Sequence, residues 1–223
     1  FVIFRLDEQG ERVPVSVAGW NREKGTVTVM VQAAGRTTRM LHTVAEGDVI
    51  TDIVGPLGKA TEMDGLKKVC VVGGGVGCAI AYPIAKEMHK KGIDVTFIAG
   101  FRSADIVILK DELKEASDKL IICTDDGSVG YNGTVATPLE STLKNVGADL
   151  VCACGPMPML NAVAKVCAEY NVPCKVSMEQ RMGCGVGACV VCSCLTVRNG
   201  QEHYARVCKD GPVFDAKEVK FNG

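Results

Sequence analysis

The sequence predicts a β-barrel plus α/β fold: a small β-barrel at residues 1–64, a doubly wound parallel-sheet domain at residues 65–176 and a small cysteine-rich domain at residues 177–223. Three observations predict this fold class. Short β-rich runs separated by turn signals fill the first segment, apolar strands alternate with helical stretches in the second, and closely spaced cysteines mark the third.

Composition limits the classes of partner. The chain has a net charge of −1 and no long basic run, which argues against nucleic acid as a partner. No apolar run reaches transmembrane length and no signal peptide is evident, so we expect a protein of the reducing cytoplasm with no membrane partner. The chain begins abruptly in a strand-like run at residues 1–6, which predicts that further residues precede Phe1.

The first segment has the pattern of a small barrel. Turn signals at residues 21–25 and 46–48 separate runs rich in β-forming residues. The expected strands are 13–17, 26–32 and 48–54, with a short helix at 37–41. Several short strands at this spacing are typical of a barrel.

The second segment alternates strands and helices. The expected strands are 69–72, 95–99, 119–124, 149–154 and, as a fifth, 172–177; the expected helices are 77–91, 105–117, 134–146 and 156–170. This alternation predicts a parallel, doubly wound sheet. Ligands of such sheets lie beyond the carboxyl ends of the strands, and glycine-marked loops follow three of them, at residues 73–77, 125–128 and 154–157.

Each glycine loop has two interpretations. The loop at 73–77 joins a strand to a helix, and its glycines would let a phosphate approach the helix N-terminus. It lacks the full G-x-G-x-x-G pattern because Cys78 takes the last position, so a tight turn without a ligand is the alternative. At 154–157, Gly155 suits a turn and Pro156 a first helical position; the functional alternative places Cys154 near a nicotinamide ring.

Two stretches of the barrel segment could hold a flavin. Residues 12–16 combine an arginine suited to phosphate with an extended backbone suited to a flat ring. Residues 35–38 offer N–H and hydroxyl groups at a helix start, where a pyrophosphate could bind. Without further context, the plainer interpretation of a strand with a surface arginine is preferred.

Four cysteines carry the most specific pattern in the chain. Cys184, Cys189 and Cys192 have C-x4-C-x2-C spacing, and Cys208 follows. This is the plant-type spacing of a [2Fe–2S] cluster, and the glycines between the cysteines suit a loop wrapped closely around one. A structural zinc site is the alternative, a disulfide framework is less favoured, and Cys194 ranks below the four as a ligand.

The order of these segments resembles the ferredoxin–NADP reductase superfamily, and within it the iron–sulfur electron-transfer subunits. Residues 178–189 and 206–214 are similar to the electron-transfer subunit of type B dihydroorotate dehydrogenase. Cys184 supports that group, because the sister group typically has Asp at this position.

The N-terminal half resembles the sister group more closely. That group is the small subunit of NADH-dependent ferredoxin:NADP oxidoreductase, also called sulfide dehydrogenase. Residues 10–14, 22–26 and 55–58 carry this similarity. In both groups the first barrel strands precede the point that corresponds to Phe1, so the resemblance implies a barrel that lacks those strands here.

The resemblance implies cofactors and residue roles. FAD would be lined by Arg12, Pro14, Val15 and Ser16, with its phosphates held by Gly35, Thr37 and Thr38. NAD(P)H would lie on Gly74, Gly75 and Gly77, bordered by Asp126, Gly127, Cys154, Gly155 and Met157. The [2Fe–2S] cluster would be bound by Cys184, Cys189, Cys192 and Cys208.

The expected function is electron transfer. A nicotinamide gives two electrons as a hydride and a [2Fe–2S] cluster takes one, so a flavin must stand between them. No side chain is required as an acid or base, and His42, His89 and His203 form no visible catalytic set. Likeness favours NADH, although Arg102 and Ser103 follow the second strand of the α/β segment, where a 2′-phosphate could bind.

The resemblance also implies a hetero-oligomer. The partner would be a catalytic flavoprotein such as dihydroorotate dehydrogenase, which implies a role in pyrimidine biosynthesis, and electrons could also run from the partner to NAD+. The first alternative is a subunit of a bifurcating ferredoxin-linked oxidoreductase, whose partner would be a larger iron–sulfur flavoprotein. The second, from another class, is a non-enzymatic nucleotide-binding module that binds zinc.

Overall fold

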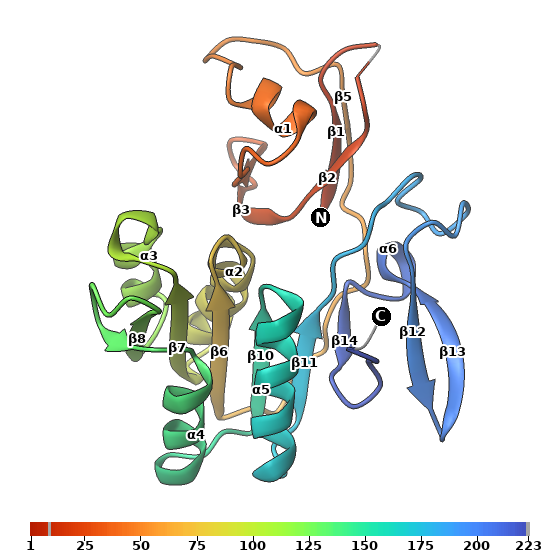
Figure 1. The fold of residues 1–223 in the computed structure, drawn as a ribbon. Helices are drawn as coiled ribbons and strands as arrows, with labels where there is room; N and C mark the ends of the chain where they lie inside the picture. The colour runs from red at the N-terminus through yellow and green to blue at the C-terminus, as the bar shows by residue number, and fades with distance from the viewer. Residues whose placement is uncertain (9, 222–223) are drawn as a thin grey trace. The chain divides into compact units, whose positions relative to one another are not determined.

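The structure, a computed structural model, describes residues 1–8 and 10–221 and divides into two compact units (Figure 1). Unit 1 comprises Phe1–Ala60, Glu179–Cys194 and Tyr204–Pro212; unit 2 comprises Thr61–Met178, Leu195–His203 and the described residues from Val213 onward. The cysteine-rich segment is thus shared between the units, and the division into three domains at residues 64 and 176 stays a prediction.

Unit 1 is built on a three-stranded antiparallel sheet in the order β2-β1-β5. The strands are β1 (Val2–Arg5), β2 (Val13–Val15) and β5 (Asp52–Val54). Ile3 is paired with Pro14 on one side and with Val54 on the other. The hydrophobic side chains of Val2, Phe4 and Val15 are buried together, so the strand expected at the start of the chain forms the centre of this sheet.

A hairpin and a short helix complete the N-terminal part of unit 1. They are β3 (Val17–Asn21), β4 (Thr26–Val29) and α1 (Arg36–Leu41). The helix expected at 37–41 is confirmed, but the strand expected at 48–54 begins at Asp52. The shortening has a local cause, because Asp48 Oδ2 accepts the Ala45 N–H at 2.7 Å and holds the chain in a turn.

Unit 2 contains a seven-stranded sheet in the order β14-β11-β10-β6-β7-β8-β9. Its strands are β6 (Lys68–Gly74), β7 (Asp94–Phe101), β8 (Lys119–Thr124), β9 (Tyr131–Asn132), β10 (Leu150–Cys154), β11 (Cys174–Ser177) and β14 (Val213–Asp215). All neighbours are parallel except β14, which is antiparallel to β11. The parallel sheet and its fifth strand are confirmed, whereas β9 and β14 were not predicted.

Helices cover both faces of this sheet, with α2 and α3 on one face and α4 and α5 on the other (Figure 1). They are α2 (Gly77–Lys90), α3 (Lys110–Glu115), α4 (Ala136–Asn145) and α5 (Met157–Glu169). In α2, Cys78, Ala81, Ala85 and Met88 recur at helical spacing and are all buried against the sheet. This apolar stripe accounts for the docking of α2.

The helix expected at 105–117 is wrong as one element. A 3₁₀ turn, Ala104–Ile106, comes first, Val107 is extended, and Leu109 adopts a left-handed conformation (φ 57°) before α3 begins. Val107, Ile108 and Leu109 all pack against the hydrophobic core. A continuous helix would turn one of these three consecutive apolar side chains to solvent. Their burial against the core therefore favours an interrupted helix.

A hairpin and a short helix lie between β11 and β14. The hairpin consists of β12 (Ser193–Arg198) and β13 (Gln201–Arg206), joined by an Asn199-Gly200 turn of the type that favours hairpins. The helix α6 (Val207–Asp210) follows and carries Cys208. Within the described residues, no helix combines the length and apolarity needed to cross a membrane.

Candidate functional site

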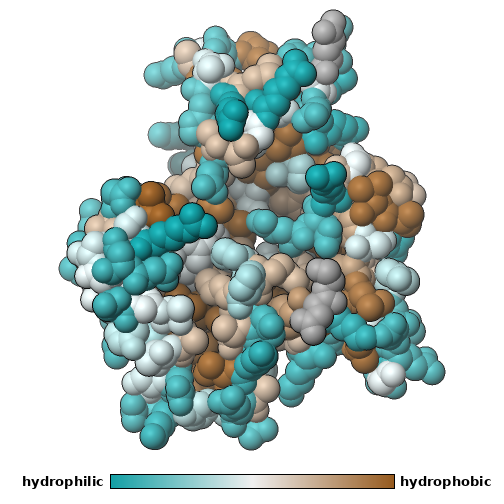
Figure 2. Space-filling model, in the orientation of Figure 1, coloured by the Kyte–Doolittle hydropathy of each residue, from teal (hydrophilic) through white to brown (hydrophobic). Residues whose placement is uncertain are grey.

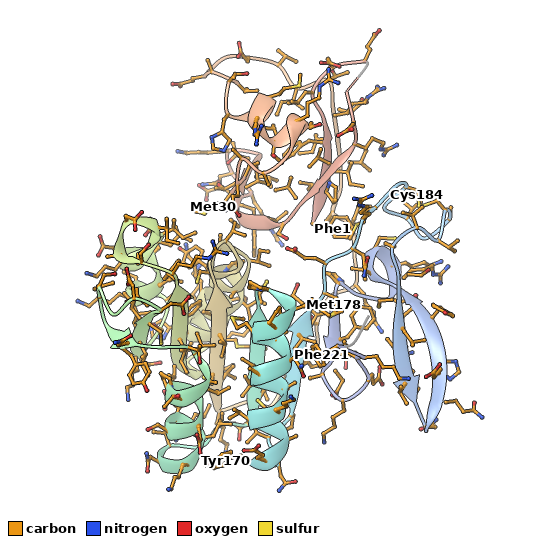
Figure 3. All side chains as sticks on the ribbon, in the orientation of Figure 1. Phe1, Met30, Tyr170, Met178, Cys184 and Phe221 are labelled. Carbon is orange, nitrogen blue, oxygen red and sulfur yellow. The ribbon has the colours of Figure 1, made fainter. Side chains whose placement is uncertain are left out.

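Cys184 lies on the loop between β11 and β12 (Figure 3), and backbone donors of this loop surround its sulfur. Ala188 N–H donates to Cys184 Sγ at 3.2 Å, and the N–H groups of Val186 and Cys189 do so at 3.4 Å. Donors directed at a sulfur stabilise its thiolate form. The pKa of Cys184 is accordingly lowered to about 6, chiefly by the Cys189 N–H and then by the Val186 N–H.

The other three predicted ligands lie in the same unit. Cys184 N–H donates to Cys189 Sγ at 3.4 Å, and Cys208 N–H donates to Cys192 Sγ at 3.4 Å. Val207 N–H also donates to the Cys192 carbonyl at 3.0 Å, which fixes the start of α6 beside the loop. Burial, followed by the Cys192 thiol, raises the pKa of Cys208 to about 11. Three cysteines of the loop and one from α6 thus form two pairs, each joined by an N–H···S hydrogen bond.

This donor set fits an iron–sulfur cluster. Cysteine thiolates are the ligands of such clusters, and N–H groups aimed at the sulfurs help to set their potential. Among residues 1–8 and 10–221, no three or more His, Cys, Asp or Glu side chains are arranged to hold a single metal ion. Cys194 is buried in β12, and burial is the main cause that raises the pKa of its thiol.

The loop combines a packed inner side with an exposed apolar tip. A Cβ at Gly185 would meet Leu57 Cδ1 at 3.0 Å, so the loop lies close against the N-terminal part of unit 1. Val186, Val190 and Val191 are each more than half exposed. Hydrophobic surface is visible over this loop in Figure 2. Cys189 is exposed as well, whereas Cys192 and Cys208 are buried.

In unit 2, two of the glycine-marked loops meet at the reversal of strand order. The chain passes from β6 to β7 on one side and returns to β10 on the other, so the carboxyl ends of β6 and β10 flank a topological switch point. A Cβ at Gly77 would collide with the Cys154 carbonyl, so glycine is required for α2 to approach β10. Gly75 N–H donates to Gly100 O at 2.8 Å and ties this loop to β7.

The loop after β10 supplies the opposite wall of this point. Cys154 is buried at the end of β10, and α5 begins at Met157, directly after Pro156. A Cβ at Gly155 would meet Gly74 Cα at 3.2 Å, so the backbones of the two loops come close together. The Met159 side chain occupies the space beside both glycines, with Sδ 2.5 Å from the Cβ position of Gly74 and Cε 2.6 Å from that of Gly155.

The loop after β8 is ordered by its own side chains. Asp126 Oδ1 accepts the Ser128 N–H at 3.0 Å and the Ser128 hydroxyl at 2.6 Å. The Ser128 hydroxyl is the first cause of the lowered pKa of Asp126. Ser128 Oγ in turn accepts the Ala104 N–H at 2.8 Å, which joins the loops after β7 and β8. Sequence reasoning assigned no part to Ser128; the Asp-x-Ser spacing of an Asx turn was its signal.

The residues predicted for a flavin lie in unit 1. Arg12 lines a cavity of about 260 Å³ that Arg5 and Asp52 also border, with apolar walls. Arg5 is ion-paired with Asp52. An arginine at a pocket of this kind suits a phosphate group. Pro14 and Val15 belong to β2, but the Val15 side chain is buried in the core, so only its backbone could line a ring.

The threonines predicted to hold phosphate are already hydrogen-bonded within the protein. Thr37 Oγ1 donates to Glu11 Oε2 at 2.9 Å, and Thr38 Oγ1 accepts the Gly35 N–H at 2.8 Å. Thr38 therefore closes the first turn of α1, and Thr37 connects α1 to the segment before β2. A phosphate here would have to share or replace these bonds.

Comparison with known proteins places the chain. Residues 179–220 match the family described as the iron–sulfur cluster binding domain of dihydroorotate dehydrogenase B. A Thermotoga maritima homologue of the dihydroorotate dehydrogenase B (NAD(+)) electron transfer subunit is 40% identical over 222 residues, which cover 100% of this chain and 77% of that protein. The electron transfer subunit of Caldanaerobacter subterraneus is 36% identical, covering 97% and 85%.

A solved structure agrees with these relatives. It belongs to work on flavin-based electron bifurcation in the NADH-dependent reduced ferredoxin-NADP oxidoreductase, and it aligns with a TM-score of 0.89 at 40% identity, covering 100% of this chain and 79% of that one. The fold is therefore the ferredoxin reductase-like fold of flavin- and nicotinamide-binding proteins, with an iron–sulfur binding segment. The chain belongs to the family of dihydroorotate dehydrogenase B electron transfer subunits, a family of oxidoreductase subunits.

Proposed function

We propose that this chain passes electrons between NAD(P)H and a partner dehydrogenase through FAD and a [2Fe–2S] cluster, as the electron transfer subunit of a dihydroorotate dehydrogenase B complex. The observation that carries the proposal is the loop in which three N–H groups converge on Cys184 Sγ, in a chain whose relatives bear that name. The C-x4-C-x2-C spacing supports the [2Fe–2S] type.

The residues of the chain would position the cofactors. When bound, the nicotinamide exchanges a hydride, the flavin converts between electron pairs and single electrons, and the cluster carries single electrons. Arg12 would neutralise flavin phosphate, with Pro14, the Val15 backbone and Ser16 beside the ring and Gly35, Thr37 and Thr38 at the pyrophosphate. Cys184, Cys189, Cys192 and Cys208 would hold the cluster.

The switch point of unit 2 would bind the nicotinamide. Gly74, Gly75 and Gly77 would form the floor, and the Met159 side chain beside Gly74 would have to move for a pyrophosphate to approach the backbone there. Gly155 and Met157 would border the ring with Cys154. Asp126 and Gly127 would close the far side. No acid or base is needed, because a hydride moves without a proton.

The reducing cytoplasm is the proposed setting. None of the twelve cysteines, which all lie among the described residues, is in a disulfide. Cys167 and Cys174 are buried and hydrogen-bonded to each other as thiols in unit 2, which supports an environment that keeps close cysteine pairs reduced.

The test is anaerobic purification of the natural complex, followed by absorbance and EPR spectroscopy with NADH and with NADPH. We expect flavin bleaching and a reduced [2Fe–2S] signal, and iron with labile sulfide in metal analysis. Cys192→Ser should lose electron transfer through the cluster but keep hydride transfer to an artificial dye. A protein loaded with FAD and iron that neither nucleotide reduces, or one that contains zinc, would overturn the proposal.

A second candidate shares the same chemistry but has another partner. The similarity to the oxidoreductase structure, with a TM-score of 0.89, favours a subunit of a bifurcating complex. Cys184 favours the dihydroorotate type. Identification of the protein that co-purifies with the chain separates the two: a dihydroorotate-oxidising flavoprotein in one case, a larger iron–sulfur flavoprotein in the other.

A further inference from the structure

Arg206 connects the two segments that carry the predicted cluster ligands. It lies at the end of β13, directly before α6, which bears Cys208. Its Nη1 donates to the Gly187 carbonyl at 3.1 Å, across 19 positions of the chain. Its Nε donates to Asp210 Oδ2 at 3.2 Å, and Asp210 Oδ2 also accepts the Arg206 backbone N–H at 2.7 Å. The carboxylate thereby holds the guanidinium in one orientation.

The carbonyl that Arg206 binds belongs to the same peptide group as an N–H that donates to Cys184 Sγ. The Gly187 carbonyl and the Ala188 N–H are the two ends of one planar unit. That N–H makes the shortest of the contacts to Cys184 Sγ, at 3.2 Å. A charged donor therefore acts on one end of a peptide whose other end acts on the predicted ligand. Hydrogen bonds in such a chain polarise one another and strengthen.

The backbone at Gly187 is built for this arrangement. Gly187 adopts φ +84°, a conformation that residues with a Cβ rarely take. A Cβ there would meet the Lys209 side chain, with Cδ at 2.6 Å and Cβ at 3.0 Å, so glycine lets the loop lie close to α6. The N–H of Gly187 is directed at Cys208. Both sides of Gly187 thus serve predicted ligands.

We propose that Arg206 is a positioning residue that raises the reduction potential of the cluster through the peptide between Gly187 and Ala188. The proposal rests on the proposed function, because it takes Cys184 as a cluster ligand. One-electron reduction, [2Fe–2S]2+ plus one electron giving [2Fe–2S]+, adds one negative charge and makes or breaks no bond. The polarised Ala188 N–H stabilises that charge at Cys184 Sγ, so the reduced state is favoured.

The neighbouring Asp210 argues against a simpler explanation, in which the positive charge of Arg206 acts on the cluster through space. Arg206 and Asp210 form an ion pair, and a charge acting through space is largely offset by its neighbouring partner. The hydrogen bond from Arg206 Nη1 to the Gly187 carbonyl is not offset in this way, because it is a short-range, directed contact with one peptide group. The effect of Arg206 is therefore expected to depend on its forked donor geometry.

The experiment is a redox titration of the complete complex followed by EPR, on wild type, Arg206→Gln, Arg206→Lys and Arg198→Gln. Arg198→Gln is the matched control. Arg198 is the last residue of β12, and its Nε lies 2.9 Å from Glu218 Oε2, so this variant also removes one positive charge from an ion pair. We expect Arg206→Gln to lower the ratio of reduced to oxidised cluster at a fixed potential about tenfold, which is about 59 mV for one electron. Arg206→Lys should shift the same way by less, and Arg198→Gln should match wild type.

The outcomes separate this inference from the proposed function. Wild-type protein without iron and sulfide would end the proposed function. A loaded Arg206→Gln variant with the wild-type potential, or an equal shift in Arg198→Gln, would overturn the role of Arg206. If Arg206→Gln loses its cluster, Arg206→Lys carries the test: a loaded protein with a lowered potential supports the role, and loss of the cluster in both variants refutes tuning, because Arg206 would then be needed for assembly.

Discussion

The cysteines Cys70 and Cys152 in the sheet of unit 2 and the cysteine Cys184 in the loop of unit 1 have opposite properties. Cys70 and Cys152 are buried in β6 and β10, and desolvation raises the pKa of both thiols, that of Cys152 to about 12. Cys184 is partly exposed, and backbone N–H donors lower its pKa to about 6. The same side chain is thus a small hydrophobe in one region and a stabilised thiolate in the other.

The difference teaches that burial and hydrogen-bond donors decide what a cysteine can do. In β6 and β10 the backbone N–H groups pair within the sheet, and no N–H donor is among the causes that shift the pKa of Cys70 or Cys152. The loop at Cys184 pairs its N–H groups with sulfur instead of with carbonyls. The number of cysteines in the chain does not distinguish buried thiols from stabilised thiolates, whereas the backbone around each cysteine does.

The largest expected effect is on iron content. Cys192→Ser should lose most of the bound iron and sulfide, because a serine hydroxyl is a poor replacement for a thiolate that binds iron. Cys174→Ser, in β11, should keep the wild-type content. Iron and acid-labile sulfide per chain are the measurement. Equal loss in both variants would break the distinction between loop and sheet cysteines.

A smaller effect is expected in thiol reactivity once iron is removed. The pKa of Cys184 near 6 makes its thiolate dominant above that pH, so alkylation of Cys184 by iodoacetamide should rise through a midpoint at about pH 6. Cys70 and Cys152 should stay unmodified until the protein unfolds. Peptide mass spectrometry after short pulses between about pH 5 and about pH 8 gives the rates. A midpoint near that of the unfolded protein would contradict the donor geometry at Cys184.

The smallest expected effect is on stability. Cys70→Ser places a hydroxyl among apolar side chains in β6, which should lower the free energy of unfolding by about 1–3 kcal/mol. Cys189→Ser in iron-free protein changes an exposed side chain and should cost less than about 0.5 kcal/mol. Urea unfolding of the two variants measures both values. A Cys70→Ser variant as stable as wild type would mean that the thiol pocket tolerates a polar group.

Some elements could be predicted and others could not. The strands β6 and β10 follow from apolar runs bounded by charged residues and glycine, because burial on both faces leaves a clear pattern. The interruption of the expected helix at Leu109 has no such local signal, because it depends on the packing of Val107, Ile108 and Leu109 against the core. The two-residue strand β9 is too short to leave a pattern at all.

The candidate site divides in the same way. The spacing of Cys184, Cys189 and Cys192 is local and indicates its chemistry directly. Thr38, predicted for phosphate, closes the first turn of α1, which a short sequence window cannot distinguish from a ligand contact. The roles of the flavin and nicotinamide residues stay predictions.

By itself, the sequence determined the alternation of strands and helices in unit 2 and the set of cysteines suited to a cluster. Both are short-range patterns of residue type, which local packing and ligand chemistry impose. The tertiary structure decided which N–H groups face Cys184 and that Arg206 reaches Gly187. Hydrogen-bond direction depends on backbone positions brought together from distant parts of the chain, so no spacing along the sequence could specify it.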